Sequence, residues 1–395
     1  MTPLAPLRHR DFRLLWIGLL VSNTGSWMQF VATGYLVDRL TLSPVYLGLL
    51  ALAQAIPRLM FAPIGGVVAD RVDRRTLLMW TNLMLAASAL LLALLTATGR
   101  ATVWHVILLG GLNSLLMSFD MPARHAMVPE LVDEEEVLQA VTLNSVAFNG
   151  AGILGPSLGG VVIAWAGEAA CFLVNALSYG AVVAAVLRMH VLAQASTSGS
   201  VSEDLVDALR TLREDGTLLG VLGAVAVLNF FGRPYFRLMP AFAREVLRAD
   251  AAQLGLLQAA PGVGTVLSAW YVARSGGGPH RLLISSAVLF GLSVSLFALS
   301  ASLWLCVGFL VAAGLFQSAA LSAANTLLQT RVDPRMRGRA MGLYSVTAFG
   351  MFTLGTFPMG LLSAAIGISH ALALGGVLTV LLVLVLGRGL ATGNR

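Results

Sequence analysis

Two carboxylates, Asp38 and Asp120, stand within or at the edge of long apolar segments, where ionisable side chains are costly and often functional. A carboxyl group can take up and release a proton at such a place. Arginine cannot, because its pKa lies above about 12. Asp120 is the better placed of the two, since it lies at helical spacing from Asn113, although Arg124 one turn away could form a purely structural pair with it. The residue types indicate proton coupling at Asp120 or Asp38.

Two arginines, Arg58 and Arg233, also lie deep inside apolar segments. A guanidinium stays charged, so each one needs a carboxylate, carbonyl groups, a wet cavity or an anionic ligand. Arg58 is too deep to reach water along a helix, whereas Arg233 shares a helix face with Asn229 and could extend outward. The aromatic residues of these segments are interpreted as core or lipid-facing side chains: Phe230, Phe349 and Phe352.

The composition shows what must hold these residues in place. The 395-residue chain is 57% hydrophobic and 11% charged, with a mean hydropathy of +0.83. Soluble proteins carry about 25% charged residues, so a polytopic membrane protein is indicated. All 25 basic residues are arginine, and the net charge of +6 is interpreted as membrane topology rather than nucleic-acid binding. Cys171 and Cys306 show neither a disulfide framework nor metal-ligand spacing.

A helix needs about 20 mostly apolar residues to cross a bilayer. Twelve segments meet this need in the sequence, which predicts an all-α membrane protein. The predicted spans are Phe12–Val37, Val45–Val68, Leu77–Thr98, Val103–Met121, Leu138–Ala164, Ala169–Met189, Leu218–Phe242, Ala252–Arg274, Leu282–Ser300, Leu303–Thr330, Ala340–Ala365 and Ser369–Leu386.

Arginine placement predicts the orientation of the spans. Most arginines fall at the N-terminus or in the even-numbered loops, and cytoplasmic loops carry the excess of basic residues. Both termini are therefore expected in the cytoplasm. The longest polar stretch predicts a cytoplasmic linker with a short amphipathic helix at 192–217, between an N-terminal six-helix bundle at 1–191 and a C-terminal six-helix bundle at 218–395.

The turn after the second segment combines a glycine, an acid and three arginines. Residues Gly66 to Arg75 read GVVADRVDRR. This run resembles the loop signature of the major facilitator superfamily of secondary transporters, with Asp73 in place of the second signature glycine. The resemblance implies the major facilitator fold. It also implies that Gly66, Asp70, Arg71 and Arg75 form a conformational latch that holds while the central cavity faces outward.

A second run, from Gly152 to Gly160, reads GILGPSLGG and lies in the fifth predicted span. Glycines at four-residue spacing let helices approach closely, and a proline bends a helix. A similar Gly-Pro-x-x-Gly-Gly run is typical of the drug–proton antiporters of this superfamily. The resemblance therefore favours export over uptake and gives a packing or export role to Gly155, Pro156, Gly159 and Gly160, although plain helix packing would need the same residues.

Shorter pieces of the first 160 residues resemble one branch, the transmembrane secretion effector group, which includes enterobactin and macrolide exporters. These pieces are Gly25–Gln29, Leu40–Pro44, Phe119–Arg124, Val128–Val132 and Leu143–Ser145. In this fold the first, fourth, seventh and tenth spans line a central cavity. The candidate substrate-binding residues are Asn23, Trp27, Arg58, Asn113, Met117, Asn229, Arg233 and Asn325.

These observations predict a monomeric secondary transporter in the inner membrane of a bacterium. It would export a small amphipathic or hydrophobic compound by alternating access, driven by protons. Alternatives are a transporter that takes up or flips an anionic or lipid-like substrate, with Arg58 and Arg233 holding the anion, and a transport-dead sensor or partner-binding protein. No catalytic constellation, metal-ligand set, cofactor motif or phosphate loop appears in the sequence, so an enzyme is not expected.

Overall fold

The computed structural model describes residues 4–189, 216–276, 278–332 and 337–392, and the described chain is helical. It divides into two compact units, and each is described by itself. One comprises Met1–Thr41 and Ala53–Gly199, the other Leu42–Leu52 and Ser200–Arg395. The predicted linker at 192–217 lies outside the described residues, except for its last two.

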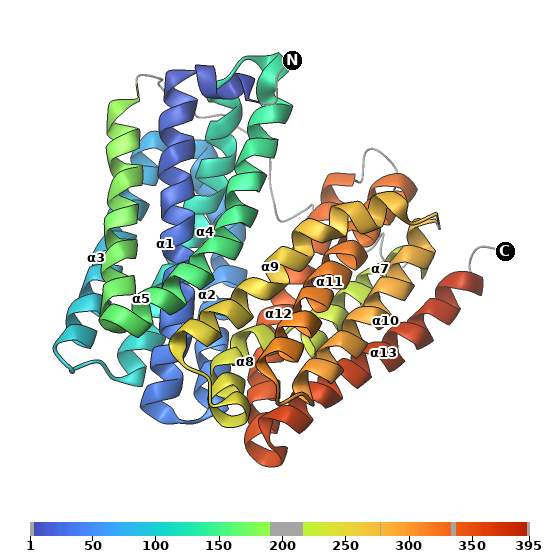
Figure 1. Ribbon diagram of the computed structural model, residues 1–395. Helices are drawn as coiled ribbons and strands as arrows, with labels where there is room; N and C mark the ends of the chain where they lie inside the picture. The colour runs from blue at the N-terminus through green and yellow to red at the C-terminus, as the bar shows by residue number, and fades with distance from the viewer. Residues whose placement is uncertain (1–3, 190–215, 277, 333–336, 393–395) are drawn as a thin grey trace. The chain divides into compact units, whose positions relative to one another are not determined.

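The first unit contains the N-terminal helices. Its elements are η1 (Ala5–Arg8), α1 (Arg10–Thr41), most of α2 (Pro44–Arg71), α3 (Arg74–Ala97), α4 (Val103–Met127), η2 (Val128–Leu131), η3 (Glu134–Glu136) and α5 (Val137–Arg188). The long helices α1, α3, α4 and α5 run side by side (Figure 1).

The second unit contains the remaining helices. They are α7 (Gly216–Val227), the π-helical η4 (Leu228–Gly232), α8 (Tyr235–Phe242), the π-helical η5 (Ala243–Leu247), α9 (Ala251–Arg274), α10 (Pro279–Ala298), α11 (Leu303–Arg331), α12 (Arg337–Ile366) and α13 (Ile368–Thr392). Within this unit α10 packs against α11 and α13, and α9 packs against α11.

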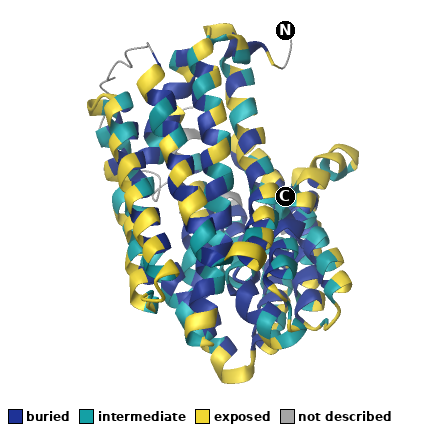
Figure 2. Cartoon of the chain, turned by 60° about the vertical axis from the view of Figure 1, so that its left-hand side comes forward, coloured by how far each residue is buried: buried dark blue, intermediate teal, exposed yellow. Residues whose placement is uncertain are grey.

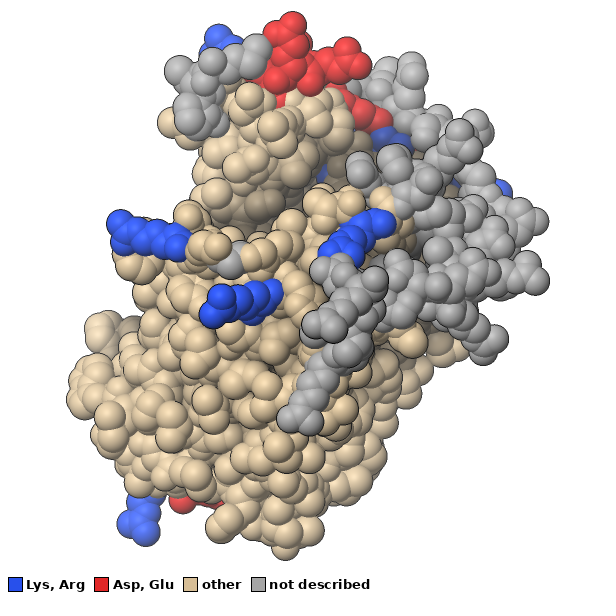
Figure 3. Space-filling model, turned by 90° about the vertical axis from the view of Figure 1, so that its right-hand side faces the viewer, with Lys and Arg blue, Asp and Glu red and all other residues tan. Residues whose placement is uncertain are grey.

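Ten helices of the described chain are long and apolar enough to cross a membrane. The 32-residue α1 is not one of them, because polar residues such as Asn23 and Gln29 interrupt its apolar sequence. Buried residues form stripes along the helices, and the residues between these stripes are intermediate or exposed, as suits helices that face lipid (Figure 2). The face shown in Figure 3 has broad areas without a charged side chain, which also suits contact with lipid.

The 52 residues of α5 form one continuous helix by hydrogen bonding, but the backbone breaks at Gly167. At 1.5 Å per residue an unbroken helix of this length would extend about 78 Å, far beyond a hydrocarbon core of about 30 Å. Gly167 has φ 77°, a conformation that costs glycine little and other residues more. The fifth and sixth predicted spans therefore join through a single glycine rather than through the loop at 165–168 that their boundaries implied.

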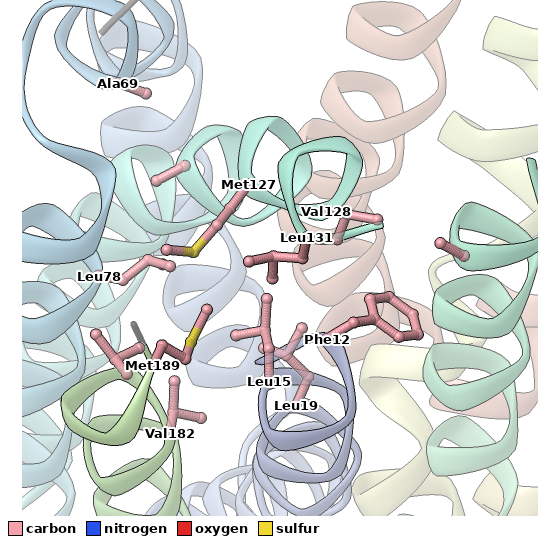
Figure 4. Close-up of a cluster of buried hydrophobic side chains, with 13 residues drawn as sticks. Phe12, Leu15, Leu19, Ala69, Leu78, Met127, Val128, Leu131, Val182 and Met189 are labelled. Carbon is pink, nitrogen blue, oxygen red and sulfur yellow. The ribbon is translucent and has the colours of Figure 1, made fainter. Parts of the chain in front are cut away.

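A core of apolar side chains holds the described N-terminal helices together. Phe12, Leu15 and Leu19 of α1 meet Met127, Val128 and Leu131 at the end of α4 and in η2 (Figure 4). Further members come from α2, α3 and α5: Ala69, Leu78, Val182 and Met189. This core lies directly under the turn between α2 and α3, so it fixes the ends of the helices that carry the charged cluster described next.

Candidate functional site

Arg74 is the centre of the charged cluster at the turn between α2 and α3. Its side chain is only 7% exposed and pairs with the carboxylate of Glu130 from η2. Its second guanidinium nitrogen lies 3.9 Å from Asp70 Oδ1, and the group also donates to the carbonyl oxygens of Ala69 and Ala126. The cluster thus ties the end of α2 to the end of α4 inside the first unit.

The other latch residues of the sequence analysis have different surroundings. Arg75 donates to the carbonyl oxygen of Leu187 at 3.0 Å, where it neutralises the C-terminal end of α5. Arg71 is exposed and Asp70 is partly exposed. The sequence analysis missed Arg74 and Glu130 as members of the cluster. Glu130 lies nine residues after the predicted end of the fourth span at Met121, and three neighbouring arginines cannot be ranked without their surroundings.

Asp73 explains the departure from the family signature. It is the N-cap of α3, and its Oδ2 accepts from the Thr76 amide at 2.9 Å and from the Thr76 hydroxyl at 2.6 Å. Its φ of −54° needs no glycine. Partial desolvation raises the pKa of Asp73, but the hydrogen bonds from Thr76 and Arg75 and the Arg75 charge outweigh it and leave that pKa below its ordinary value. The cap is therefore intact at neutral pH and weakens as pH falls through this lowered pKa.

Gly65, rather than its neighbour, is the glycine that the packing requires. A methyl group at Gly65 would overlap the backbone carbonyl of Ser118 on α4, whereas a methyl group at Gly66 would meet nothing within 4 Å. Nearby, the Ser114 hydroxyl donates to the Gln54 carbonyl at 2.5 Å. The α2–α4 crossing is thus a backbone-to-backbone contact, and the packing does not explain Gly66 as part of the latch.

Asp120 lies in a fully buried polar network between α3 and α4. Its Oδ1 accepts from Thr81 at 3.0 Å and from Asn82 at 2.6 Å, and its Oδ2 pairs with Arg124. Arg124 also donates to Asn82 at 3.2 Å, which closes the network. Asp120 thus has two hydrogen bonds at Oδ1 and an ion pair at Oδ2, which favours the structural role that its spacing from Arg124 left open.

The face of α4 that was assigned to a cavity contacts α3 instead. Asn113 accepts from the Ser88 hydroxyl at 2.7 Å, and Met117 packs on the buried cluster that contains Leu85. Asp120 meets α3 on the same face. Both Asn113 and Met117 are only half-buried, so part of each side chain remains available. A role for them in binding substrate stays a prediction.

Asp38 is buried near the end of α1, and the next residue forms an ion pair. Arg39 Nε lies 2.8 Å from Glu168 Oε1, and Glu168 is itself 9% exposed at the break in α5. Glu168 is a buried carboxylate that the sequence analysis did not consider, because it falls between two predicted spans. The break at Gly167 is what brings it to α1.

The glycine run of the fifth span packs on α1. A methyl group at Gly152 would lie 3.5 Å from the indole ring of Trp27, and methyl groups at Gly155 and Gly159 would lie against Trp27 and Met28. The Trp27 ring also contacts the ring of Phe148 on α5 in a tilted arrangement, with centroids 6.3 Å apart. Pro156 and Gly160 are buried inside α5, and Asn23 is half-buried one turn before Trp27. The packing role of this run is what the contacts support.

Arg58 and Arg233 both lie at the middle of a candidate span. Arg58 is central in Pro44–Arg71, and Arg233 is the middle residue of Leu219–Leu247. Arg58 is exposed on α2. A charged residue at the centre of a spanning helix costs about 3 kcal/mol on insertion scales, so each needs a compensating environment.

The surroundings of Arg233 come from two elements. Its guanidinium lies 4.4 Å from the centroid of the Phe352 ring on α12, and it donates to Asn229 Oδ1 at 3.3 Å. Asn229 belongs to the π-helical η4 and donates in turn to the Val225 carbonyl at 2.8 Å. Phe352 was interpreted as core or lipid-facing, and it is in fact both buried and a cation–π partner of Arg233. Such π-helical turns occur frequently at functional sites.

Two further observations complete the candidate residues. Asn325 is half-buried on α11 and accepts from Gln329 Nε2 at 2.5 Å. The described residues contain no group of three or more His, Cys, Asp or Glu side chains that could hold a metal ion.

At the N-terminus, Arg8 and His9 contact Glu136 at 2.6 Å and 3.0 Å. These contacts tie η1 to η3 and were not predicted.

Comparison with known proteins identifies the family. The enterobactin exporter EntS of Salmonella typhi is 25% identical, over 96% of this chain and 93% of its own. Macrolide efflux protein A of Streptococcus pyogenes is 23% identical, over 95% and 94%. In fold, the chain is similar to a bacterial homologue of the human lysosomal transporter Spinster, with a TM-score of 0.80 at 13% identity, over 98% of both chains. The model of the transmembrane secretion effector family matches residues 1–391, so the chain belongs to this family of major facilitator transporters, which are multi-pass membrane proteins and not enzymes.

Proposed function

We propose that this chain is a secondary active exporter of a small amphipathic or hydrophobic compound, working by alternating access and driven by protons. The observation that carries the proposal is the match over nearly the whole chain to relatives named for efflux and export. The charged residues at mid-span, Arg58 and Arg233, support it, because the family fold gives them a central cavity to face. The other residues proposed to face that cavity are Asn23, Trp27, Asn113, Met117, Asn229 and Asn325.

The proposed architecture has twelve spans in two six-helix bundles. Ten candidate spans become twelve when α1 is added and α5 is divided at Gly167. The proposed bundles are 1–191 and 218–395, joined by the cytoplasmic linker at 192–217. The protein is proposed to be a monomer in the inner membrane of a bacterium, with both termini in the cytoplasm, because its arginines favour that side.

The orientation can be tested with single cysteines at Arg100 and Ser198, in a background where the buried Cys171 and Cys306 are replaced. An impermeant maleimide is expected to label the cysteine at position 100 from outside intact cells. The cysteine at position 198 should react only after the membrane is opened. Labelling of both positions from outside would contradict the proposed topology.

Proton coupling requires a carboxylate that changes its protonation during the cycle. Asp120 and Asp38 are the proposed groups, and both are buried. The network around Asp120 gives it a way to act, since Arg124 and Asn82 can keep bonding to each other while Asp120 gains or loses a proton. Asp120→Asn is proposed to hold the group in its neutral form and so uncouple it from the gradient.

Flux in proteoliposomes tests the function and the coupling together. With an imposed pH gradient, the parent protein is expected to move a fluorescent amphipathic dye. The gradient-driven flux of Asp120→Asn should be at least about tenfold lower than that of the parent, while the variant still binds the dye in detergent. Full coupled flux in Asp120→Asn would move the role to Asp38 or to another ion. No gradient-dependent flux across a panel of drugs, siderophores and lysolipids would favour the transport-dead sensor.

The latch is proposed to use Asp70, Arg71 and Arg75 together with Gly66. Arg74 and Glu130 join it here, because they form the ion pair that Asp70 approaches. The export role of Gly155, Pro156, Gly159 and Gly160 is proposed to act through the packing of α5 on α1.

A further inference from the structure

The guanidinium of Arg233 has only uncharged partners among the described residues. It donates one hydrogen bond to the Asn229 amide and covers the ring of Phe352. The ion pairs between described residues do not include Arg233. A guanidinium has five N–H donors, so most of its donors are not used by these partners.

The aromatic stack determines which part of the guanidinium can take a ligand. Arg233 Cζ lies over the Phe352 ring, 4.4 Å from its centroid, so the ring contacts one side of the guanidinium and most of the N–H groups remain for hydrogen bonds. Carboxylates bind guanidinium in its plane through two parallel N–H···O bonds. An arrangement with one covered side and N–H groups that remain for hydrogen bonds therefore favours a planar anion over a second cation or a neutral apolar group.

The backbone around Arg233 holds this arrangement firmly. A methyl group at Gly355 on α12 would overlap the Phe230 carbonyl of η4, so the two elements meet backbone to backbone. This close approach sets the distance between Phe352 and Arg233. Phe230 and Phe231 of η4 pack edge to face on each other at 4.9 Å. The site thus combines the Arg233 cation with the ring of Phe352.

From these observations we propose that Arg233 binds the carboxylate of the transported compound, so the substrate class is an amphipathic carboxylic acid whose apolar body lies against the aromatic residues. The inference rests on the proposed function only in that the bound acid is the compound that the protein transports. Binding of the acid itself can be measured without a gradient. A carboxylate site also accounts for the position of Arg233 at mid-span, because a bound anion would neutralise the arginine charge during the transport cycle.

The test uses biphenyl-4-carboxylic acid and its primary amide, which have the same shape and differ in charge. Thermal stabilisation of the purified protein in detergent at pH 7 is expected for the acid, with apparent affinity about tenfold weaker for the amide. Arg233→Gln should remove the preference for the acid, and Arg233→Lys should retain part of it, because lysine keeps the charge but not the fork. Arg237→Gln, one turn along and 5.7 Å from the same ring, is the matched control and should retain it.

The outcomes separate this inference from the proposed function. Equal affinity for acid and amide in the parent protein would overturn the carboxylate site, even if export is later measured. A preference that survives Arg233→Gln would place the anion elsewhere, for example at Arg58. Stabilisation by phosphatidylglycerol but not by the acid would show a lipid site and would also overturn it. Unfolding midpoints without ligand show whether each variant is folded.

Discussion

Gly65→Ala is expected to lower the free energy of unfolding by about 3 kcal/mol and to remove most of the monodisperse protein recovered in detergent. The added methyl group would overlap the Ser118 carbonyl, and backbone cannot move aside as a flexible side chain can. Relief would require α2 and α4 to separate, which would break the Ser114–Gln54 hydrogen bond and expose polar backbone in lipid. The measurement is the thermal unfolding midpoint of the purified protein.

Gly66→Ala is the matched control, one residue along the same helix. It meets nothing within 4 Å, and alanine is favoured over glycine in a helix by about 1 kcal/mol. Its midpoint should therefore equal or exceed that of the parent. Similar losses in both variants would mean that the helix tolerates no side chain here for another reason, and the α2–α4 crossing would not be the cause.

Arg74→Gln is expected to cost about 3 kcal/mol of stability, at the lower end for a broken buried ion pair because Glu130 is partly exposed. The loss should exceed that of Arg71→Gln, which removes an exposed arginine of the same loop and should stay within about 0.5 kcal/mol. Unfolding in detergent, followed by the thermal midpoint, compares the two.

A double-mutant cycle assigns the effect to the pair. Arg74→Gln and Glu130→Gln should together cost less than the sum of the single losses, with a coupling of about 1 to 3 kcal/mol. Additive losses at Arg74 and Glu130 would show that the contact between them contributes little.

The sequence predicts the helices well because the cost of polar groups in lipid leaves a strong hydropathy signal. Each predicted span overlaps a helix of the described chain, and the fifth and sixth spans join at Gly167 where a loop at 165–168 was expected. The turn at Asp73 also follows from local rules, because an aspartate at the N-cap position accepts a hydrogen bond from the backbone amide three residues later, which here belongs to Thr76. Such features depend on neighbours in the chain.

The partners of the charged residues depend on packing and could not be predicted in this way. Arg74 has the same type and nearly the same position as Arg71, and only the folded chain shows which one is buried against Glu130. The stack of Arg233 on Phe352 joins residues from two helices far apart in sequence. The spacing of Asn113 and Asp120 places them on one face of α4, but their contacts with Ser88 and Asn82 of α3 depend on packing.

The close packing of α5 on α1 has a consequence for how this protein can acquire a new substrate. Gly152 and Gly155 hold one side of α1 at Trp27, and Gly25 of α1 fits against Ser178 on the second half of α5. Interlocked backbones resist sliding and turning about the helix axis. Trp27 is therefore tied to its neighbours, and its replacement by a different large residue would need a matching change across the seam. Under the proposed role of Trp27 in binding substrate, adaptive changes in selectivity should accumulate at less constrained residues that are proposed to face the cavity, and Trp27 should change last.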